Sequence, residues 1–131
     1  AFANRDLEFF NHADDLTLPL DPGLFRRAME NIIINALTHN PPETKVKITV
    51  DAEGTKGVWI SVLDNGVGMS ESELTELFDR YYRGTNTKEK PEGTGLGLAI
   101  AKQIITLHGG EITVTSKIDA GTQFLIYLPR N

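Results

Sequence analysis

Apolar residues between Leu24 and His39 recur at the three- and four-residue spacing of an α-helix. They stand at positions 24, 25, 28, 29, 32, 33, 36 and 37, so they share one face. Asp21 and Pro22 come before this run as an N-cap and a first-turn proline, and Pro41 follows it. The pattern predicts an amphipathic helix that starts near Pro22 and ends at about His39.

Alternation of apolar and polar residues predicts two neighbouring strands. Apolar side chains occupy every second position of Lys45–Ala52, and Val58–Asp64 is a second run rich in β-branched and aromatic residues. The intervening residues include two glycines, which favours an antiparallel hairpin. Leu7–His12 and Leu16–Leu20 are further candidate strands ahead of the long helix.

The second half of the chain predicts two helices and a closing hairpin. Ser70 and Glu73 form a capping-box pattern, which opens a short helix to about Phe78. The polar stretch Thr85–Gly95 is typical of a loop. Leu96–His108 has helical apolar spacing and ends at two glycines. The last two predicted strands are Glu111–Ser116 and Thr122–Leu128.

The order of these elements indicates the fold class. Because the strands come mostly as antiparallel neighbours, the helices must cover one face of a single sheet. We expect an α/β two-layer sandwich (α+β), with a mixed, mostly antiparallel sheet covered on one face by about three helices. The length of 131 residues fits one domain over 1–131.

Composition excludes several kinds of site. The chain has no cysteine, so it can form neither a disulfide nor a thiolate metal centre. Its formal net charge of −5 disfavours nonspecific binding to nucleic acid. A polyanionic ligand would therefore need cations placed locally. No apolar run approaches the length of a membrane-spanning helix.

Two asparagines one helical turn apart interrupt the long apolar helix. Asn31 and Asn35 share a face among isoleucine and leucine residues, where an unpaired amide is costly. Asn35 can offer its amide oxygen to a hard cation. The alternative is that both amides only satisfy nearby backbone groups, which is the usual role of a buried polar side chain.

A carboxylate followed by two glycines ends the second strand of the first hairpin, in the sequence DNGVGM from Asp64 to Met69. The glycines let the main chain approach a ligand closely, and Asp64 can accept a hydrogen bond from the exocyclic amine of adenine. An ordinary strand-to-helix turn explains the same residues equally well, since Asp-Asn-Gly is common in turns.

Three alternating glycines, Gly93, Gly95 and Gly97, surround the start of the helix at Leu96. Their backbone N–H groups and the positive end of the helix dipole can cradle phosphates. The pattern is not a Walker A loop, because no Gly-Lys-Ser/Thr follows it. It is not a dinucleotide-binding fingerprint either, because it lacks the preceding strand and βαβ unit.

Two arginines accompany aromatic residues in LFDRYYRG, from Leu77 to Gly84. Arg80 and Arg83 can supply local cations for phosphates, although they can also simply face solvent. We expect the aromatic side chains to anchor this segment to the core rather than to stack on a base.

The four motifs, in this order, closely resemble those of the Bergerat-type ATP-binding fold, which histidine kinases, gyrase, mismatch-repair ATPases and large heat-shock chaperones share. The resemblance runs from about Leu16 to Leu128. NIIINALTHN, from Asn31, looks like the N box, and DNGVGM like the first glycine box. LFDRYYRG looks like the F box, and GTGLGL, from Gly93, like the second glycine box. The F box points to the catalytic domain of bacterial sensor histidine kinases.

This resemblance implies that ATP and Mg²⁺ are the cofactors. Asn35 would ligate Mg²⁺, with Asn31 supporting it. Asp64 would bind the adenine amine, with Thr122 near it through water, and His39 would lie near adenine or ribose.

The remaining matching residues would contact the nucleotide mainly through backbone or charge. Gly66 and Gly68 would shape the adenine pocket, and residues 85–92 would form a lid. The residues expected around the phosphates are Arg80, Arg83, Gly93, Gly95, Leu96, Gly97 and Leu98.

The residue one turn before Asn35 bears on the reaction. Hydrolysing relatives carry a glutamate there as the general base for water, whereas this chain has Asn31, whose amide cannot take up a proton. Glu30 is adjacent but lies about 100° away around the helix. Phosphoryl transfer to a protein histidine is therefore favoured over hydrolysis.

The acceptor histidine would lie on a separate dimerisation domain that this chain lacks. None of His12, His39 and His108 has the histidine-acid context of a phosphoacceptor. We expect His12 to be solvated and His108 to be a helix-end cation or a surface residue.

The implied function is to bind ATP–Mg²⁺ and donate its γ-phosphate in two-component signal transduction. The implied partners are the dimerisation domain of the same kinase and a response regulator, with no nucleic acid and no direct membrane contact by this domain. A cytoplasmic domain of a protein that can be anchored in the cell membrane is expected. Two alternatives stay open: a non-catalytic nucleotide-sensing module, suggested by Thr38 in place of the family's frequent basic residue, and a slow ATPase.

Overall fold

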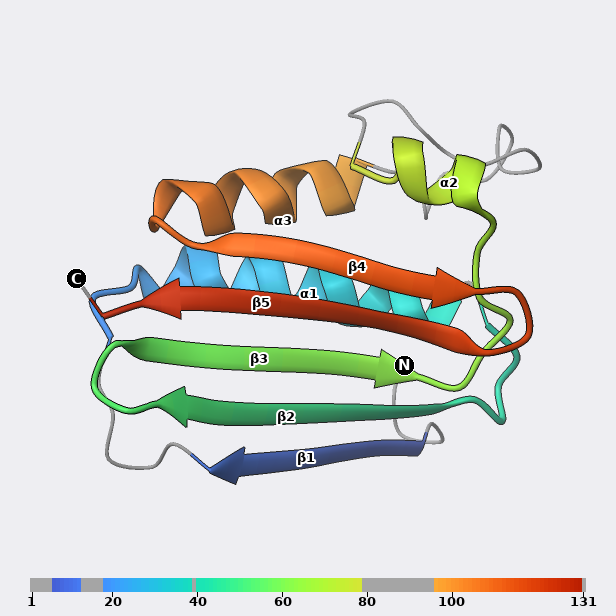
Figure 1. Cartoon of the computed structure of the whole chain (residues 1–131), viewed down its shortest axis with the longest axis horizontal. Helices are drawn as coiled ribbons and strands as arrows, with labels where there is room; N and C mark the ends of the chain where they lie inside the picture. Colours follow the sequence, from blue (N-terminus) through green and yellow to red (C-terminus); the bar gives the residue numbers. More distant parts are fainter. Residues whose placement is uncertain (1–5, 13–17, 39, 79–95, 131) are drawn as a thin grey trace.

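A computed structural model describes residues 6–12, 18–38, 40–78 and 96–130. These residues form one five-stranded sheet and three helices (Figure 1). The elements in chain order are β1 (Asp6–His12), α1 (Pro22–Thr38), β2 (Lys45–Glu53), β3 (Gly57–Asp64), α2 (Glu71–Glu76), α3 (Leu96–Leu107), β4 (Glu111–Lys117) and β5 (Gly121–Pro129).

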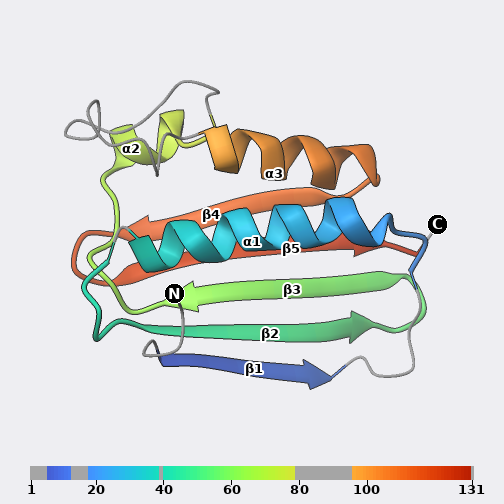
Figure 2. The same cartoon turned by 180° about the vertical axis from the view of Figure 1, so that it is seen from behind.

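The sheet is mixed and mostly antiparallel, as the sequence predicts. Its strand order is β1-β2-β3-β5-β4, in which β1 pairs with β2 in parallel and the other pairs are antiparallel. Both predicted hairpins, β2–β3 and β4–β5, are confirmed. The α/β two-layer class is also confirmed, because α1 and α3 lie on one face of the sheet and contact each other (Figures 1 and 2).

The core lies between the helices and the sheet. α1 contributes its stripe of small and aliphatic side chains, including Ala28 and Ile32, and α3 contributes residues such as Ile105. Every second residue of β3 and β5 faces this layer, which buries side chains such as Val62 and Phe124. Apolar residues at every second position of the strands and at helical spacing in α1 therefore meet in one core between the sheet and the helices.

Local capping explains the short helix α2. Ser70 accepts a hydrogen bond from the backbone N–H of Glu73, and the Glu73 carboxylate accepts one from the backbone N–H of Ser70. This reciprocal pair confirms the predicted capping box and satisfies two N–H groups at the start of the helix. Leu77 and Phe78 follow α2 and pack on the core, with the Phe78 and Phe124 rings 6.5 Å apart.

The strand predicted at Leu16–Leu20 is wrong for residues 18–20, which are not in a strand, while residues 16 and 17 lie outside the described part. Leu18 and Leu20 pack against the core instead. The backbone N–H of Leu20 donates to the carbonyl of Leu18, so this segment turns toward α1. Apolar residues at alternate positions thus serve core packing here without a partner strand.

His108 connects the C-terminal end of α3 to the start of α1, which corrects the expectation of a helix-end cation or surface residue. Its Nδ1 lies 2.8 Å from the carbonyl oxygen of Ile104, and its Nε2 lies 3.1 Å from the backbone nitrogen of Asp21. A carbonyl can only accept and an N–H can only donate, so Nδ1 carries the proton and the ring is neutral. The side chain is half-buried and used as a connector between helices.

Replacing His108 with alanine is expected to lower the free energy of unfolding by about 1 to 2 kcal/mol, because two hydrogen bonds are lost at the α1–α3 junction. Thermal or urea unfolding of the two proteins measures the difference. Gln103→Ala, an exposed position on the same helix, is the control. Equal stability of wild type and His108→Ala would contradict the assigned connection.

One end of the sandwich gathers the ends of several elements (Figures 1 and 2). The C-terminal ends of α1, β3 and β4 lie there, together with the beginnings of α2, α3 and β5. The described residues of the first two motifs, at the end of α1 and after β3, belong to these ends, as does the start of α3, so the topology brings distant parts of the chain together. None of the helices formed by the described residues has the length and apolar character needed to span a membrane.

Candidate nucleotide-binding site

A row of polar side chains crosses three strands at this end of the sheet. Asp64 on β3 pairs with Thr122 on β5, which pairs in turn with Ser116 on β4. All three follow the alternation that points Val62, Phe124 and Val114 into the core, so their side chains lie on the helix-facing side. Asp64 is only 4% exposed and Thr122 only 7%. The rim of an apolar core thus carries three neighbouring polar groups.

Asp64 is held by backbone donors but remains costly to ionise. Its Oδ1 accepts a hydrogen bond of 2.9 Å from the backbone N–H of Gly66. Burial raises the pKa of the Asp64 carboxyl above its ordinary value, and backbone hydrogen bonds from Gly66 and Thr122 partly offset that increase. A buried carboxylate with unused acceptor capacity is suited to a ligand that donates hydrogen bonds.

Asn40 holds the loop after Asp64 from the end of α1. Its Oδ1 accepts from the backbone N–H of Val67 at 2.9 Å, and its Nδ2 donates to the carbonyl of Ala36 at 2.6 Å. The same side chain packs so closely on Gly66 that a Cβ there would collide with it. Gly66 is therefore required by the approach of Asn40, whatever else it does for a ligand.

The β4–β5 turn holds the loop from the other side. Gly68 has a φ of +73°, and a Cβ at this position would collide with the carbonyl oxygen of Lys117. The backbone N–H of Asp119 donates to the carbonyl of Val67 at 2.8 Å, and the Ser116 hydroxyl accepts from the backbone N–H of Met69 at 2.8 Å. Chain segments about 50 residues apart in sequence are thus fastened together around Asp64.

Two of these holding residues, Asn40 and Ser116, were missed by sequence reasoning. Asn40 looks like a helix stop in the sequence, and Ser116 looks like an ordinary strand residue. Their partners are 27 and 47 residues away, so no local pattern signals them. The Ser-x-x-x-x-Gly-Thr spacing at the final turn is the one signal that could have drawn attention to Ser116.

Asn31 and Asn35 are half-buried on α1. Gly97 of α3 lies next to Asn31, because a Cβ on Gly97 would be 3.5 Å from the Asn31 Cγ. Within the described part of the chain, the structure records no hydrogen bond from either side-chain amide. The interpretation that both amides satisfy nearby backbone therefore finds no support in these residues.

Thr38 uses its hydroxyl within its own helix. The Oγ1 donates to the carbonyl of Ile34 at 2.8 Å, with a longer contact of 3.5 Å to the carbonyl of Asn35. Such back-bonding is common for threonine in helices. Thr38 consequently supplies neither a charge nor a free proton donor at the end of α1.

The structure brings together part of the predicted site. Asp64, Gly66, Gly68 and Thr122 lie at one end of the sheet, and α1 and α3 present Asn31 and Gly97 to each other above the same face. Leu96 begins α3, and the Leu98 side chain is buried in the core, so it could meet a ligand only through its backbone. The predicted residues His39, Arg80, Arg83, Gly93 and Gly95, and the predicted lid, lie outside the described residues.

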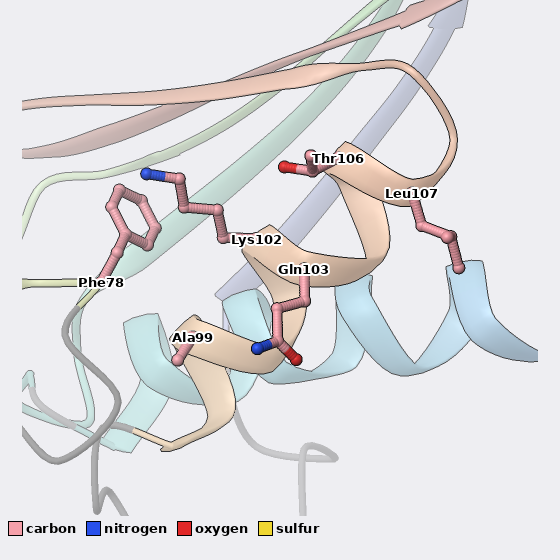
Figure 3. A pocket seen from close by; sticks show the side chains of 6 residues that line it. All are labelled: Phe78, Ala99, Lys102, Gln103, Thr106 and Leu107. Atoms are coloured by element: carbon pink, nitrogen blue, oxygen red, sulfur yellow. The ribbon is translucent and has the colours of Figure 1, made fainter.

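A hollow of about 410 Å³ lies beside α3 (Figure 3). It is lined by Phe78 and five residues of α3, and the Lys102 ammonium lies 5.1 Å from the centre of the Phe78 ring. Neither Asp64 nor Thr122 lines it. The hollow is therefore distinct from the polar row of Asp64, Thr122 and Ser116.

Most of the chain matches a known protein family. Residues 20–131 match the family model described as histidine kinase-, DNA gyrase B- and HSP90-like ATPase. The chain belongs to this family. The resemblance drawn from the four motifs is thereby confirmed, and the matched range includes every residue of the polar row and both asparagines of α1.

Curated relatives of this ATPase domain are sensor kinases. The chain is 45% identical over 122 residues to the sensor histidine kinase YvrG of Bacillus subtilis, covering 92% of this chain and 21% of that protein. It is 38% identical over 117 residues to the sensor histidine kinase WalK of the same organism, covering 88% of this chain and 19% of that protein. The chain thus spans about a fifth of the length of these relatives.

Solved histidine kinase structures share the fold. The catalytic domain of histidine kinase ThkA superposes with a TM-score of 0.81 at 27% identity, covering 97% of this chain and 81% of that one. The mycobacterial sensor histidine kinase MprB gives a TM-score of 0.79 at 27% identity, covering 96% and 82%. Within the ATPase family, the chain is therefore similar to histidine kinase catalytic domains.

Proposed function

We propose that this ATPase domain binds ATP with Mg²⁺ and donates the γ-phosphate to a histidine of a separate dimerisation domain. The observation that carries the proposal is the buried Asp64, set beside Thr122 at the rim of the core and fastened by Gly66. Its carboxylate can accept from the adenine amine, while the nearby ends of α1 and α3 face the phosphates. Catalysis would consist mainly of positioning and charge neutralisation.

The residues of α1 fit a magnesium ion that is bound together with phosphates. The Asn35 amide oxygen has no recorded protein donor among the described residues, and amide oxygens are suitable ligands for this hard cation. The described residues contain no group of three or more His, Cys, Asp or Glu that could hold a metal. Asn35 would therefore hold Mg²⁺ only jointly with phosphate oxygens of the nucleotide, and Asn31 would support it.

Side-chain placement on α1 supports transfer over hydrolysis. Glu30 is exposed, whereas Asn31 is half-buried beside Gly97. The carboxylate that could act as a base for water thus points away from the face that carries Asn31. An amide at the inward position cannot take up the proton of an attacking water.

The wider assignments rest on the relatives, which are sensor histidine kinases. We infer that the acceptor domain belongs to the same kinase, that a response regulator receives the phosphate, and that this domain works in the cytoplasm of a protein that can be membrane-anchored. Arg80, Arg83, His39, Gly93 and Gly95 remain proposed contacts of the phosphates and adenine.

Phosphoryl transfer tests the proposal directly. The domain is mixed with γ-labelled ATP, Mg²⁺ and the dimerisation domain of its own kinase. Label should appear on the partner in an acid-labile, alkali-stable form, as expected for phosphohistidine. ATP binding without any transfer would favour the nucleotide-sensing alternative, to which the back-bonded Thr38 also points. Steady phosphate release by the domain alone, lost in Asn35→Ala, would favour a slow ATPase.

Removing the amide of Asn35 should separate metal from nucleotide binding. Asn35→Ala is expected to weaken ATP binding about tenfold in the presence of Mg²⁺, corresponding to about 1.4 kcal/mol, and much less in EDTA. Calorimetric titration in both conditions measures this. Asn65→Ala serves as the amide control, because Asn65 Oδ1 instead accepts from the Lys45 backbone N–H. An equal loss with and without Mg²⁺ would assign Asn35 a role other than metal binding.

A further inference from the structure

Ser116 has one hydroxyl proton and three hydrogen-bonding partners. Its Oγ lies 2.8 Å from the backbone nitrogen of Met69, 2.8 Å from the carbonyl oxygen of Gly121 and 2.8 Å from the Thr122 Oγ1. The residue is half-buried on β4, directly beside Thr122 on β5. Counting donors and acceptors among these groups determines which way each proton points.

Two of the three partners have fixed roles. The Met69 N–H can only donate, so Ser116 Oγ must accept from it. The Gly121 carbonyl can only accept, so Ser116 must spend its single proton there. Toward Thr122, Ser116 therefore has only a lone pair left, and the hydroxyl proton of Thr122 must point at Ser116. Any other assignment would leave two oxygen lone pairs facing each other at 2.8 Å.

The consequence is that Thr122 can offer only lone pairs to anything else. Asp64, its cross-strand neighbour, likewise presents a carboxylate that only accepts. The two buried side chains together form a surface without a proton donor. A ligand edge that donates a hydrogen bond is accepted there, whereas a ligand edge that presents a carbonyl oxygen finds no proton.

We propose that Ser116 is a specificity-determining residue that selects 6-aminopurine over 6-oxopurine nucleotides by fixing the Thr122 hydroxyl as an acceptor. This inference rests on the proposed function, in which Asp64 accepts from the adenine amine, and it adds that the Thr122 hydroxyl contacts the base directly rather than through water. Ser116 has no capacity left for the ligand, because Met69, Gly121 and Thr122 use its proton and both lone pairs. It acts as a positioning residue through Thr122 rather than as a contact of the nucleotide.

The discriminating experiment compares ATP with inosine triphosphate, which carries an oxo group in place of the 6-amino group. Calorimetric titration with Mg²⁺ gives the ratio of the two dissociation constants for wild type and for Ser116→Ala. Without Ser116, the Thr122 hydroxyl loses its acceptor and can rotate to donate to the 6-oxo group. The ratio of the dissociation constants of inosine triphosphate and ATP should therefore fall about tenfold, mainly because inosine triphosphate binds more tightly.

A purely structural role of Ser116 predicts a different outcome. Loosening the loop at Met69 would weaken both nucleotides by the same factor, so an unchanged ratio would overturn the proposal. Thr115→Ala, on the same strand but with an exposed side chain, is the matched control and should leave the ratio unchanged. Failure of the wild type to bind either nucleotide would refute the proposed function itself and is thereby distinguished from failure of this inference.

Thr122→Val is a second test variant, in which the hydrogen bonds from Ser116 to Met69 and Gly121 are kept. It removes the hydroxyl at nearly constant shape, so the preference for ATP should again fall. In this background, adding Ser116→Ala should change the ratio no further, because no hydroxyl remains to be oriented. An unaltered ratio in Thr122→Val, or additive effects in the double variant, would contradict the assignment even if Ser116→Ala does not fold.

Discussion

Replacing Asp64 with asparagine is expected to weaken ATP binding about 100-fold while the domain stays folded. Asparagine keeps an oxygen that can accept from the Gly66 N–H, so the loop retains its anchor. Its NH₂ group, however, places a donor where the adenine amine also donates. Losing a charge-assisted hydrogen bond and creating this mismatch costs about 2.7 kcal/mol, which corresponds to the stated factor.

The same substitution should leave the free energy of unfolding unchanged or raise it at neutral pH. Burial raises the pKa of the Asp64 carboxyl above its ordinary value of 3.8, so ionising this carboxyl costs more free energy in the folded state than in the unfolded state. For such a group the stabilising contribution is full below the unfolded pKa and is lost as pH rises through the folded pKa. The substituted amide carries no charge at any of these pH values. The stability advantage of Asp64→Asn should therefore be largest near pH 7 and shrink toward pH 4.

Binding and stability are measured on the same two proteins. Calorimetric titration of ATP with Mg²⁺ gives the affinity, and thermal unfolding at several pH values gives the stability difference. Asp119→Asn is the matched control, because Asp119 is exposed at the same end of the sheet and its φ of +65° also suits asparagine. It removes the same charge without touching the buried row. Unimpaired ATP binding by Asp64→Asn would rule out the proposed adenine contact.

A methyl group at Gly68 is expected to lower the free energy of unfolding by about 3 kcal/mol or more, which for a domain of this size corresponds to about 10 °C in melting temperature. Two effects add. The backbone at Gly68 has a φ of +73°, which disfavours alanine, and the new Cβ would collide with the carbonyl oxygen of Lys117. Because the collision is with main chain, the loop or the β4–β5 turn must move.

Gly54→Ala separates the two effects. Gly54 also has a positive φ, +56°, but nothing lies within 4 Å of a Cβ at that position. The free energy of unfolding should therefore fall by only about 1 kcal/mol in Gly54→Ala, because backbone strain acts alone there. ATP affinity should fall in Gly68→Ala and remain unchanged in Gly54→Ala, because only Gly68 lies beside the polar row. Comparable stability losses in the two variants would show that the contact with Lys117 has little energetic weight.

Local pattern was sufficient for most of the secondary structure. The apolar spacing of α1, the alternation of β2 and the capping box at Ser70 depend on residues within a few positions of one another. Their interactions are strong enough to be read without knowing the rest of the fold. The order of the motifs was also sufficient to predict the family, which the match of residues 20–131 to the family model confirms.

The sequence did not predict the roles of residues whose partners are distant along the chain. His108 has the spacing of an ordinary helix end, yet it bonds the backbone of Asp21, 87 residues earlier. The alternating leucines before α1 look like a strand, yet Leu18 and Leu20 fill the core. In both cases the outcome depends on which neighbour is available in space, and sequence spacing carries no information on that.

The sequence by itself determined most of the elements, the two-layer class and the first set of candidate residues, because these follow from periods, caps and short motifs of a few residues. Only the tertiary structure decided how those residues meet: Asn40 against Gly66, and Ser116 between Met69 and Thr122. The physical reason is that a hydrogen bond depends on distance and direction. The register of β3, β5 and β4 sets both for the row Asp64, Thr122 and Ser116.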